Sequence, residues 1–414
     1  MTLLISIAFR FQALRGSLAT FFLLLAVGLF NPVTAQERQL SDDAQISMIT
    51  IYPGEAPEEL FGHSAIRVKD PRQDIDLSFN YGTFQFDSFF LPKFIYGQLD
   101  YFLSVARFSN AVRQYELRRR PMIEQVLNLT AEQRQDLFDF LLVNAREENR
   151  YYRYDFLFDN CSTRIRDAMV TVLGDEILFA PEPDPGLTFR QLIDLYVDHQ
   201  PLYDFGIDLL LGGKIDRVAE PWETMFLPDY LMEAFEHATV KIDGEMQPLV
   251  ANTEKILQID NYQAPKAGIP WAAVMTWTLF LIGVVTTYIN FSNKQSIQRW
   301  LDIPLFLFAG IVGLLITFLW FISLHEVTAN NLNLLWALPT HLILLPMLYR
   351  RTASGRRAGI YLAASAFLCL AIAIGWFAWP QALHPAVLPI LLLLFLRSGW
   401  IAVSSDQLTV ISKQ

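Results

Sequence analysis

The pattern of apolar residues divides this chain into two parts at about residue 270. Beyond that point, short polar segments separate apolar runs of about 20 residues, which is long enough for a helix to cross a bilayer. Five runs are predicted to be membrane helices: 270–289, 303–324, 332–349, 358–378 and 384–403. Residues 270–414 are therefore predicted to form an all-α, multi-span membrane domain.

The basic residues between these runs predict an orientation. None occurs in the second and fourth connecting segments. Those of the first and third are Lys294, Arg299, Arg350, Arg351, Arg356 and Arg357. Because basic loops stay in the cytoplasm, residues 36–269 are predicted to lie on the opposite side, outside the inner membrane.

Residues 1–35 have the pattern of an export signal peptide. Arg10 and Arg15 precede a short apolar run, and Val33 and Ala35 occupy the small-residue positions of a cleavage site. A signal requires the same orientation as the basic loops. The alternative is a retained N-terminal anchor, for which the apolar run is short.

Residues 36–269 carry the patterns of a separate, water-exposed domain. Apolar and polar residues alternate at 46–52, 64–70 and 76–84, which favours strands of an antiparallel sheet. A capping box at Thr130 predicts a helix, and a second helix with one apolar stripe is predicted to begin near Asp159 and to end at Gly174. The domain is predicted to be α+β.

The charge composition limits the possible functions. The chain is 53% apolar but has 42 acidic residues against 32 basic ones, a net charge of −10. This charge disfavours nucleic-acid binding. The sequence has neither a metal-ligand spacing nor a phosphate-binding glycine loop. We therefore expect no nucleic-acid partner, no metal and no cofactor.

Cys161 is the cysteine of the predicted periplasmic domain. If Asp159 or Asn160 caps the helix, the sulfur lies in the first turn, where free N–H groups and the helix dipole stabilise a thiolate. The other cysteine, Cys369, lies in a predicted membrane helix and cannot form a disulfide with it. An unpaired cysteine in an exported domain is either a reactive thiol or a small buried residue. Both interpretations remain open at this point.

A thiolate nucleophile needs a base, and His63 is the candidate. It follows Gly62 at the entry of a predicted strand, where a side chain can point into a cleft. His199 and His237 lie in polar surroundings that are typical of the protein surface.

Three stretches around these residues resemble a known family. The segments "FGHSAIRV", "FNYGTFQFDSFF" and "YYRYDFLFDNCSTRIRD" are similar to the periplasmic domain of the Lnb-type lipoprotein N-acyltransferases, and the similarity covers roughly residues 45–240. More distantly, a histidine before an Asn-Cys helix start is similar to the circularly permuted papain-like enzymes, such as lecithin:retinol acyltransferases. The resemblance implies an α+β papain-like (circularly permuted) periplasmic domain with Cys161 as nucleophile and His63 as base.

A third residue is expected to orient the imidazole. Asn80 is the candidate because it lies on the strand after His63, on the face opposite Tyr81. A turn asparagine is the alternative. Tyr81, Tyr154 and Arg164 are candidates for substrate binding, and packing or a solvated surface explains each of them equally well.

A thiolate in a membrane-attached domain indicates acyl transfer, because the thioester formed from an ester reacts readily with an amine. With the resemblance, we expect a lipoprotein N-acyltransferase that moves an acyl chain from a phospholipid through Cys161 to the N-terminal amine of a diacylglyceryl lipoprotein. Two alternatives remain. One is a periplasmic cell-wall cysteine peptidase or amidase, and the other is a non-enzymatic membrane-bound binding or assembly protein.

Overall fold

The computed structural model describes residues 39–411, without 86–87, 99, 181–185, 261, 263–265, 294–299 and 350–355. The predicted export signal at 1–35 lies outside the described residues. So do four of the basic residues that set the predicted orientation: Lys294, Arg299, Arg350 and Arg351.

A seven-stranded antiparallel sheet is the centre of the domain that precedes the membrane helices. Its strand order is β10-β5-β1-β2-β3-β4-β6. The strands are β1 (Gln45–Ile51), β2 (His63–Asp70), β3 (Ile75–Thr83), β4 (Asp100–Arg107), β5 (Met122–Leu127), β6 (Tyr151–Arg153) and β10 (Val250–Leu257). The three predicted strands are confirmed as β1, β2 and β3, which are neighbours in the sheet.

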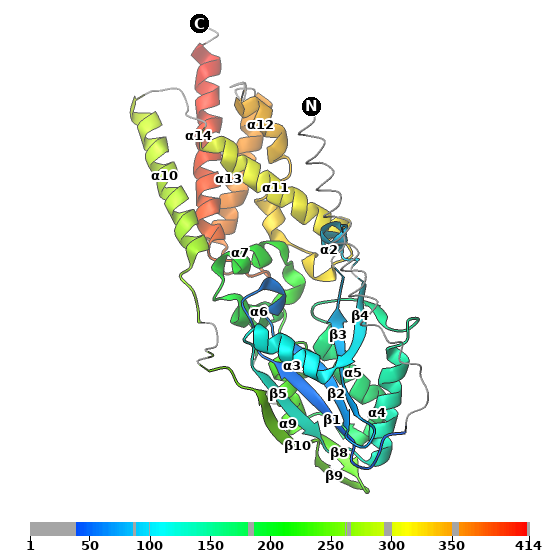
Figure 1. The fold of residues 1–414 in the computed structure, drawn as a ribbon. Helices are drawn as coiled ribbons and strands as arrows, with labels where there is room; N and C mark the ends of the chain where they lie inside the picture. Colours follow the sequence, from blue (N-terminus) through cyan, green and yellow to red (C-terminus); the bar gives the residue numbers. More distant parts are fainter. Residues whose placement is uncertain are drawn as a thin grey trace, which may run out of the picture. The chain divides into compact units, whose positions relative to one another are not determined.

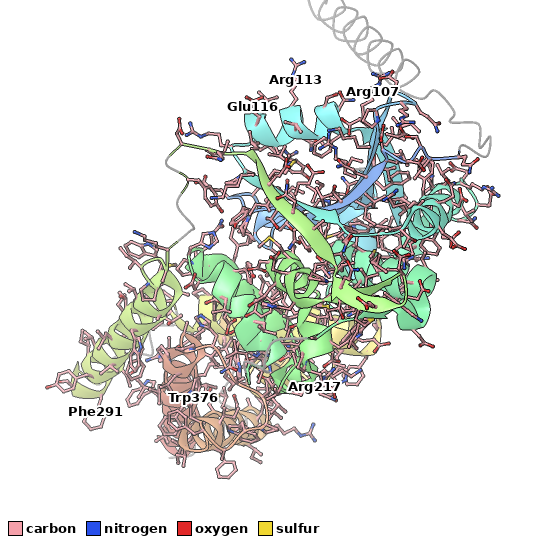
Figure 2. All side chains as sticks on the ribbon, turned by 90° about the horizontal axis from the view of Figure 1, so that it is seen from below. Arg107, Arg113, Glu116, Arg217, Phe291 and Trp376 are labelled. Carbon is pink, nitrogen blue, oxygen red and sulfur yellow. The ribbon has the colours of Figure 1, made fainter. Side chains whose placement is uncertain are left out.

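Helices cover both faces of this sheet (Figure 1). On one face, α4 (Ala131–Asn144), α5 (Cys161–Leu173) and α9 (Pro228–His237) bury a core that includes Ile66 and Phe79. On the other face, Phe108 and Tyr115 of α3 (Phe108–Leu117) pack on strand residues, while Arg113 and Glu116 point outward (Figure 2). The periplasmic domain is therefore α+β, as predicted.

Both predicted helices of this domain form at the expected residues. The α4 helix begins after Thr130, whose hydroxyl accepts from the Gln133 N–H at 3.1 Å while the Gln133 side chain accepts from the Thr130 N–H at 3.0 Å. The α5 helix ends at Gly174. Reciprocal capping of this kind satisfies two N–H groups that a helix start leaves free.

Smaller elements complete the domain. The remaining strands form a second sheet: β7 (Ile177–Leu178), β8 (Thr239–Ile242) and β9 (Glu245–Pro248). The remaining helices are α2 (Phe90–Tyr96), α6 (Phe189–Val197), α7 (Pro201–Leu210) and α8 (Pro221–Thr224).

The C-terminal part of the chain is helical and apolar. Its helices are α10 (Trp271–Asn293), α11 (Asp302–Phe321), α12 (His341–Tyr349), α13 (Arg356–Ile374) and α14 (Val387–Ile411). Within the described residues, three stretches are long and apolar enough to cross a membrane: Trp271–Ser292, Asp302–Phe321 and Arg357–Ile374. The side chain of Phe291 on α10 projects outward, as lipid-facing residues do (Figure 2).

The third and fifth predicted membrane segments differ from the other three. Residues 332–349 form a short 3-10 helix and the nine-residue α12, which contains Pro346. Pro removes a backbone donor and interrupts helical hydrogen bonding. In the fifth segment, the apolar stretch at Val387–Val403 is shorter than a full span. The count of five spans therefore stays a prediction.

One buried ion pair joins three of the membrane helices. Arg397 of α14 donates to both carboxylate oxygens of Asp302 of α11, at 2.6 and 3.0 Å, and to the Thr287 hydroxyl of α10 at 2.7 Å. Arg397 and Asp302 are fully buried. The arginine that interrupts the fifth apolar run is thus a structural contact between helices.

Candidate active site

Asn160 positions Cys161 at the first residue of α5. The Asn160 side-chain oxygen accepts from the backbone N–H groups of Ser162 at 2.8 Å and Thr163 at 3.0 Å. Its amide nitrogen donates to the Phe226 carbonyl at 2.8 Å, which ties the helix start to the rest of the domain. Of the two predicted caps, Asn160 is the one used. Cys161 is therefore in the first helical turn, as predicted.

The strand register brings His63 and Asn80 to the same face of the sheet. Ile66 is opposite Phe79 in the β2–β3 pair. Side chains alternate along a strand, so His63, three residues before Ile66, and Asn80, next to Phe79, point to a common side of the two strands. His63 Nε2 and Asn80 Oδ1 are 2.7 Å apart. Since an amide oxygen only accepts, Nε2 donates, and Nδ1 is left for other contacts.

His63 and Cys161 stabilise each other's charged forms. Burial opposes the imidazolium, but the charge of Cys161 and hydrogen bonds to Cys161 and Asn80 outweigh it, so the pKa of His63 is raised. Burial also opposes the thiolate, but the His63 charge and contacts from His63, Ser64 and Ser162 lower the pKa of Cys161. Opposite shifts of this kind favour a thiolate-imidazolium pair. Both residues are half-buried rather than closed off within the core.

Gly82 lies beside this pair. Its φ of +89° is in the left-handed region that favours glycine. A Cβ atom at this position would lie 3.6 Å from the Cys161 Cβ and 3.7 Å from the His63 Cε1. The two reactive side chains therefore meet beside a backbone that carries no side chain. Close by, the hydroxyls of Ser64 and Ser162 are 3.1 Å apart and join β2 to α5.

Comparison with protein families agrees with this geometry. The family model of the Lnb N-terminal periplasmic domain matches residues 34–194, and that of the Lnb transmembrane domain matches residues 268–407. The chain belongs to the Lnb family. It is accordingly a membrane protein with a periplasmic domain. Among curated proteins and among solved structures, none is found to match it.

The three predicted substrate-binding residues of this Lnb-family chain lie in different surroundings. Tyr81 is buried in the core, as the packing alternative expects. Tyr154 is stacked on Tyr101 with ring centroids 4.1 Å apart. Arg164 forms an ion pair with Asp159, and its guanidinium lies 4.0 Å from the ring centre of Tyr152. The charge that lowers the pKa of Cys161 is thus that of His63, while Arg164 is paired elsewhere.

Two tyrosines near Cys161 were not singled out from the sequence. Burial raises the pKa of Tyr101 to about 12, and the charge of Cys161 adds to the shift. Burial and the same charge also raise the pKa of Tyr152. The tyrosine-rich segment before Cys161 could have pointed to Tyr152 as a residue of the site. No sequence pattern pointed to Tyr101, because β4 comes to the site through its pairing with β3 and β6.

Four further histidines are exposed or contact other residues. His237 is exposed, and His199 contacts its neighbour Gln200 at 3.4 Å. His325 contacts α2, and His384 lies 3.2 Å from Asp204.

An acidic group between α6 and α7 could not be read from sequence spacing. Asp194, Asp204 and Asp208 bring their carboxylates within 4.8 Å of one another. The guanidinium of Arg190 forms an ion pair with Asp208 at 2.7 Å, which neutralises part of this negative charge. Burial and the neighbouring acids raise the pKa of Asp194 to about 7.

Proposed function

We propose that this protein is a cysteine-dependent acyltransferase of the inner membrane, which moves a fatty acyl chain from a phospholipid to the N-terminal amine of a diacylglyceryl lipoprotein. The observation that carries the proposal is the arrangement of three side chains: Cys161 in a first helical turn, His63 beside it, and Asn80 on the far nitrogen of His63. This is the order nucleophile, base and orienting group that covalent catalysis requires.

In the first half-reaction, the Cys161 thiolate attacks the ester carbonyl carbon of the phospholipid. A carbon–sulfur bond forms and the ester carbon–oxygen bond breaks. The leaving alkoxide takes the proton from the His63 imidazolium and departs as the hydroxyl of a lysophospholipid. The products are a thioester on Cys161 and a neutral His63.

In the second half-reaction, the lipoprotein amine attacks the thioester carbonyl carbon. His63 accepts the amine proton while the carbon–nitrogen bond forms and the carbon–sulfur bond breaks. An amide is released, and the thiolate and imidazolium are restored. Asn80 serves both steps by holding the ring through Nε2, which leaves Nδ1 for the proton transfers.

The membrane helices support a lipid substrate over a soluble one. Both proposed substrates are anchored in a bilayer, and a membrane domain holds the site next to them, which replaces a search in three dimensions by one in a plane. Residues 268–407 match the Lnb transmembrane domain as one unit.

The test is intact-mass measurement of the full-length protein in phospholipid vesicles. We expect a mass increase of one acyl chain on Cys161 that neutral hydroxylamine removes, because thioesters are sensitive to it. Adding a diacylated lipopeptide should discharge the adduct and give a triacylated product. Cys161→Ala should give no adduct.

Two results would contradict the proposal. A chain that forms no adduct from phospholipid is not a ping-pong acyltransferase. An adduct that water discharges but the lipopeptide does not would favour the hydrolase alternative, whose acyl-enzyme is released to water.

A further inference from the structure

The helix α2 exposes large apolar side chains although it belongs to the periplasmic domain. None of its seven residues is buried. Phe89, which caps it, is 68% exposed, Leu91 is 62% exposed and Phe94 is 50% exposed. Contiguous exposed apolar side chains mark a surface that contacts a membrane or another apolar partner.

The neighbours of α2 identify that partner. The Leu324 N–H donates to the Tyr96 carbonyl at 2.8 Å, and His325 Nε2 donates to the Phe94 carbonyl at 2.7 Å. Leu324 and His325 lie three and four residues after the end of α11, one of the membrane-length helices. The α2 helix is therefore attached beside the end of α11, the level at which a membrane-length helix leaves a bilayer. Lipid is the partner found at this level.

Gly97 makes this attachment possible. It ends α2 with a φ of +81°. A Cβ at this position would lie 3.2 Å from the His325 backbone nitrogen, which is closer than side chains normally approach. Arg153 of β6 also donates to the Leu324 carbonyl. The sheet domain and the end of α11 are thus held together from two sides.

A row of aromatic rings leads from α2 to the candidate nucleophile. Consecutive ring centroids lie 6.1 Å apart for Phe94 and Phe90, 5.5 Å for Phe90 and Phe84, and 5.1 Å for Phe84 and Tyr101. Tyr101 is stacked on Tyr154 at 4.1 Å. Tyr101, Tyr154 and Cys161 all pack against the same apolar core, so the inner end of the row and the nucleophile border one cluster, and the charge of Cys161 contributes to the raised pKa of both tyrosines.

We propose that α2 lies in the outer leaflet and that this aromatic row, Phe94-Phe90-Phe84-Tyr101-Tyr154, is the path along which the acyl chain of a phospholipid reaches Cys161. The path deepens the acyltransferase proposed above and rests on it, while the position of α2 in lipid does not. Aromatic rings provide a continuous apolar surface for methylene groups, and they lose little conformational freedom when they bind.

The position of α2 is tested with an environment-sensitive fluorophore. The fluorophore is attached to Leu91→Cys in the full-length Cys161→Ser protein in vesicles. The remaining cysteine, Cys369, is fully buried and is not expected to be labelled. Leu178→Cys is the matched control, because Leu178 is 60% exposed and lies on β7 in the small sheet. We expect blue-shifted emission and quenching by spin-labelled lipid at position 91 but not at 178. Water-like emission at both positions would overturn the membrane position of α2.

The acyl path is tested by removing one of its aromatic side chains. Phe84→Ala opens the middle of the row, so adduct formation from dipalmitoyl phosphatidylethanolamine should fall about tenfold or more. The loss should be much smaller with the dihexanoyl lipid, whose chains are too short to follow the row. Leu178→Ala is the control and should leave the ratio of the two rates unchanged.

The outcomes separate the two proposals. Equal losses with both lipids in Phe84→Ala would overturn the acyl path alone. No adduct with either lipid in the unmodified chain would overturn the proposed function and the path together, and the fluorophore would still decide whether α2 lies in the membrane.

Discussion

Two charged pairs of this protein lie in opposite surroundings. Arg397 and Asp302 are fully buried between membrane helices, and the arginine has a third partner in Thr287. His63 begins β2, Cys161 begins α5, and both residues are half-buried. In a pair that is closed to solvent, the loss of one partner destabilises the fold strongly, because it leaves the other charge buried and uncompensated. A pair that favours its charged form but keeps one side open is available for chemistry.

The two cysteines give the largest expected difference. Cys161→Ala should lower acyl-adduct formation about a thousandfold or more, because it removes the nucleophile. Cys369→Ala removes a buried thiol far from the site and should leave the rate within about twofold while lowering stability modestly. The measurement is adduct formation by intact mass, at matched protein levels in the membrane. Equal losses in both variants would contradict the assigned roles.

The buried pair predicts a large effect on stability. Asp302→Asn leaves the Arg397 charge without a partner and should reduce the free energy of unfolding by about 3–5 kcal/mol. Replacing both residues by Leu and Met should recover much of this loss. Asp43→Asn at the exposed pair with Arg72 is the control, and it is expected to leave stability nearly unchanged. Unfolding in detergent provides the comparison, and similar losses at the two sites would argue against the burial of Arg397.

The open pair predicts a change in pH dependence. His63 is the charge that lowers the pKa of Cys161, while burial raises it. In His63→Gln only the contacts from Ser64 and Ser162 still oppose the effect of burial, so the pKa of Cys161 rises and the thiolate fraction at neutral pH falls. We expect iodoacetamide to alkylate Cys161 of the wild-type chain at a pH below the ordinary range of cysteine. In His63→Gln, Cys161 should react only at higher pH. Superimposable rate profiles would show that the two groups do not interact.

Asn80 predicts the smallest of these effects, because it acts through His63. Asn80→Ala should lower the rate up to about a hundredfold by freeing the imidazole. Asn80→Asp keeps an oxygen acceptor and should retain more activity. It should also raise the upper pH limit of the rate, since a carboxylate stabilises the imidazolium. A rate profile that neither variant shifts would place Asn80 in a structural role.

The sequence alone determined the local elements of this protein. Strand alternation predicted β1, β2 and β3, and the capping residue Thr130 predicted the start of α4, because both signals act over a few residues. The same reasoning placed Cys161 in a first helical turn. The resemblance of short motifs indicated the Lnb family. The circularly permuted papain-like relationship stays a prediction.

Tertiary structure decided what these elements do together. The contact of His63 with Asn80 follows from strand register, and that of His63 with Cys161 from the packing of α5 on the sheet. Tyr101 comes to the site through the pairing of β4, and α2 meets His325 across 231 positions of the chain. Pairings between distant segments depend on the sum of many packing contacts, and local patterns carry no record of that sum.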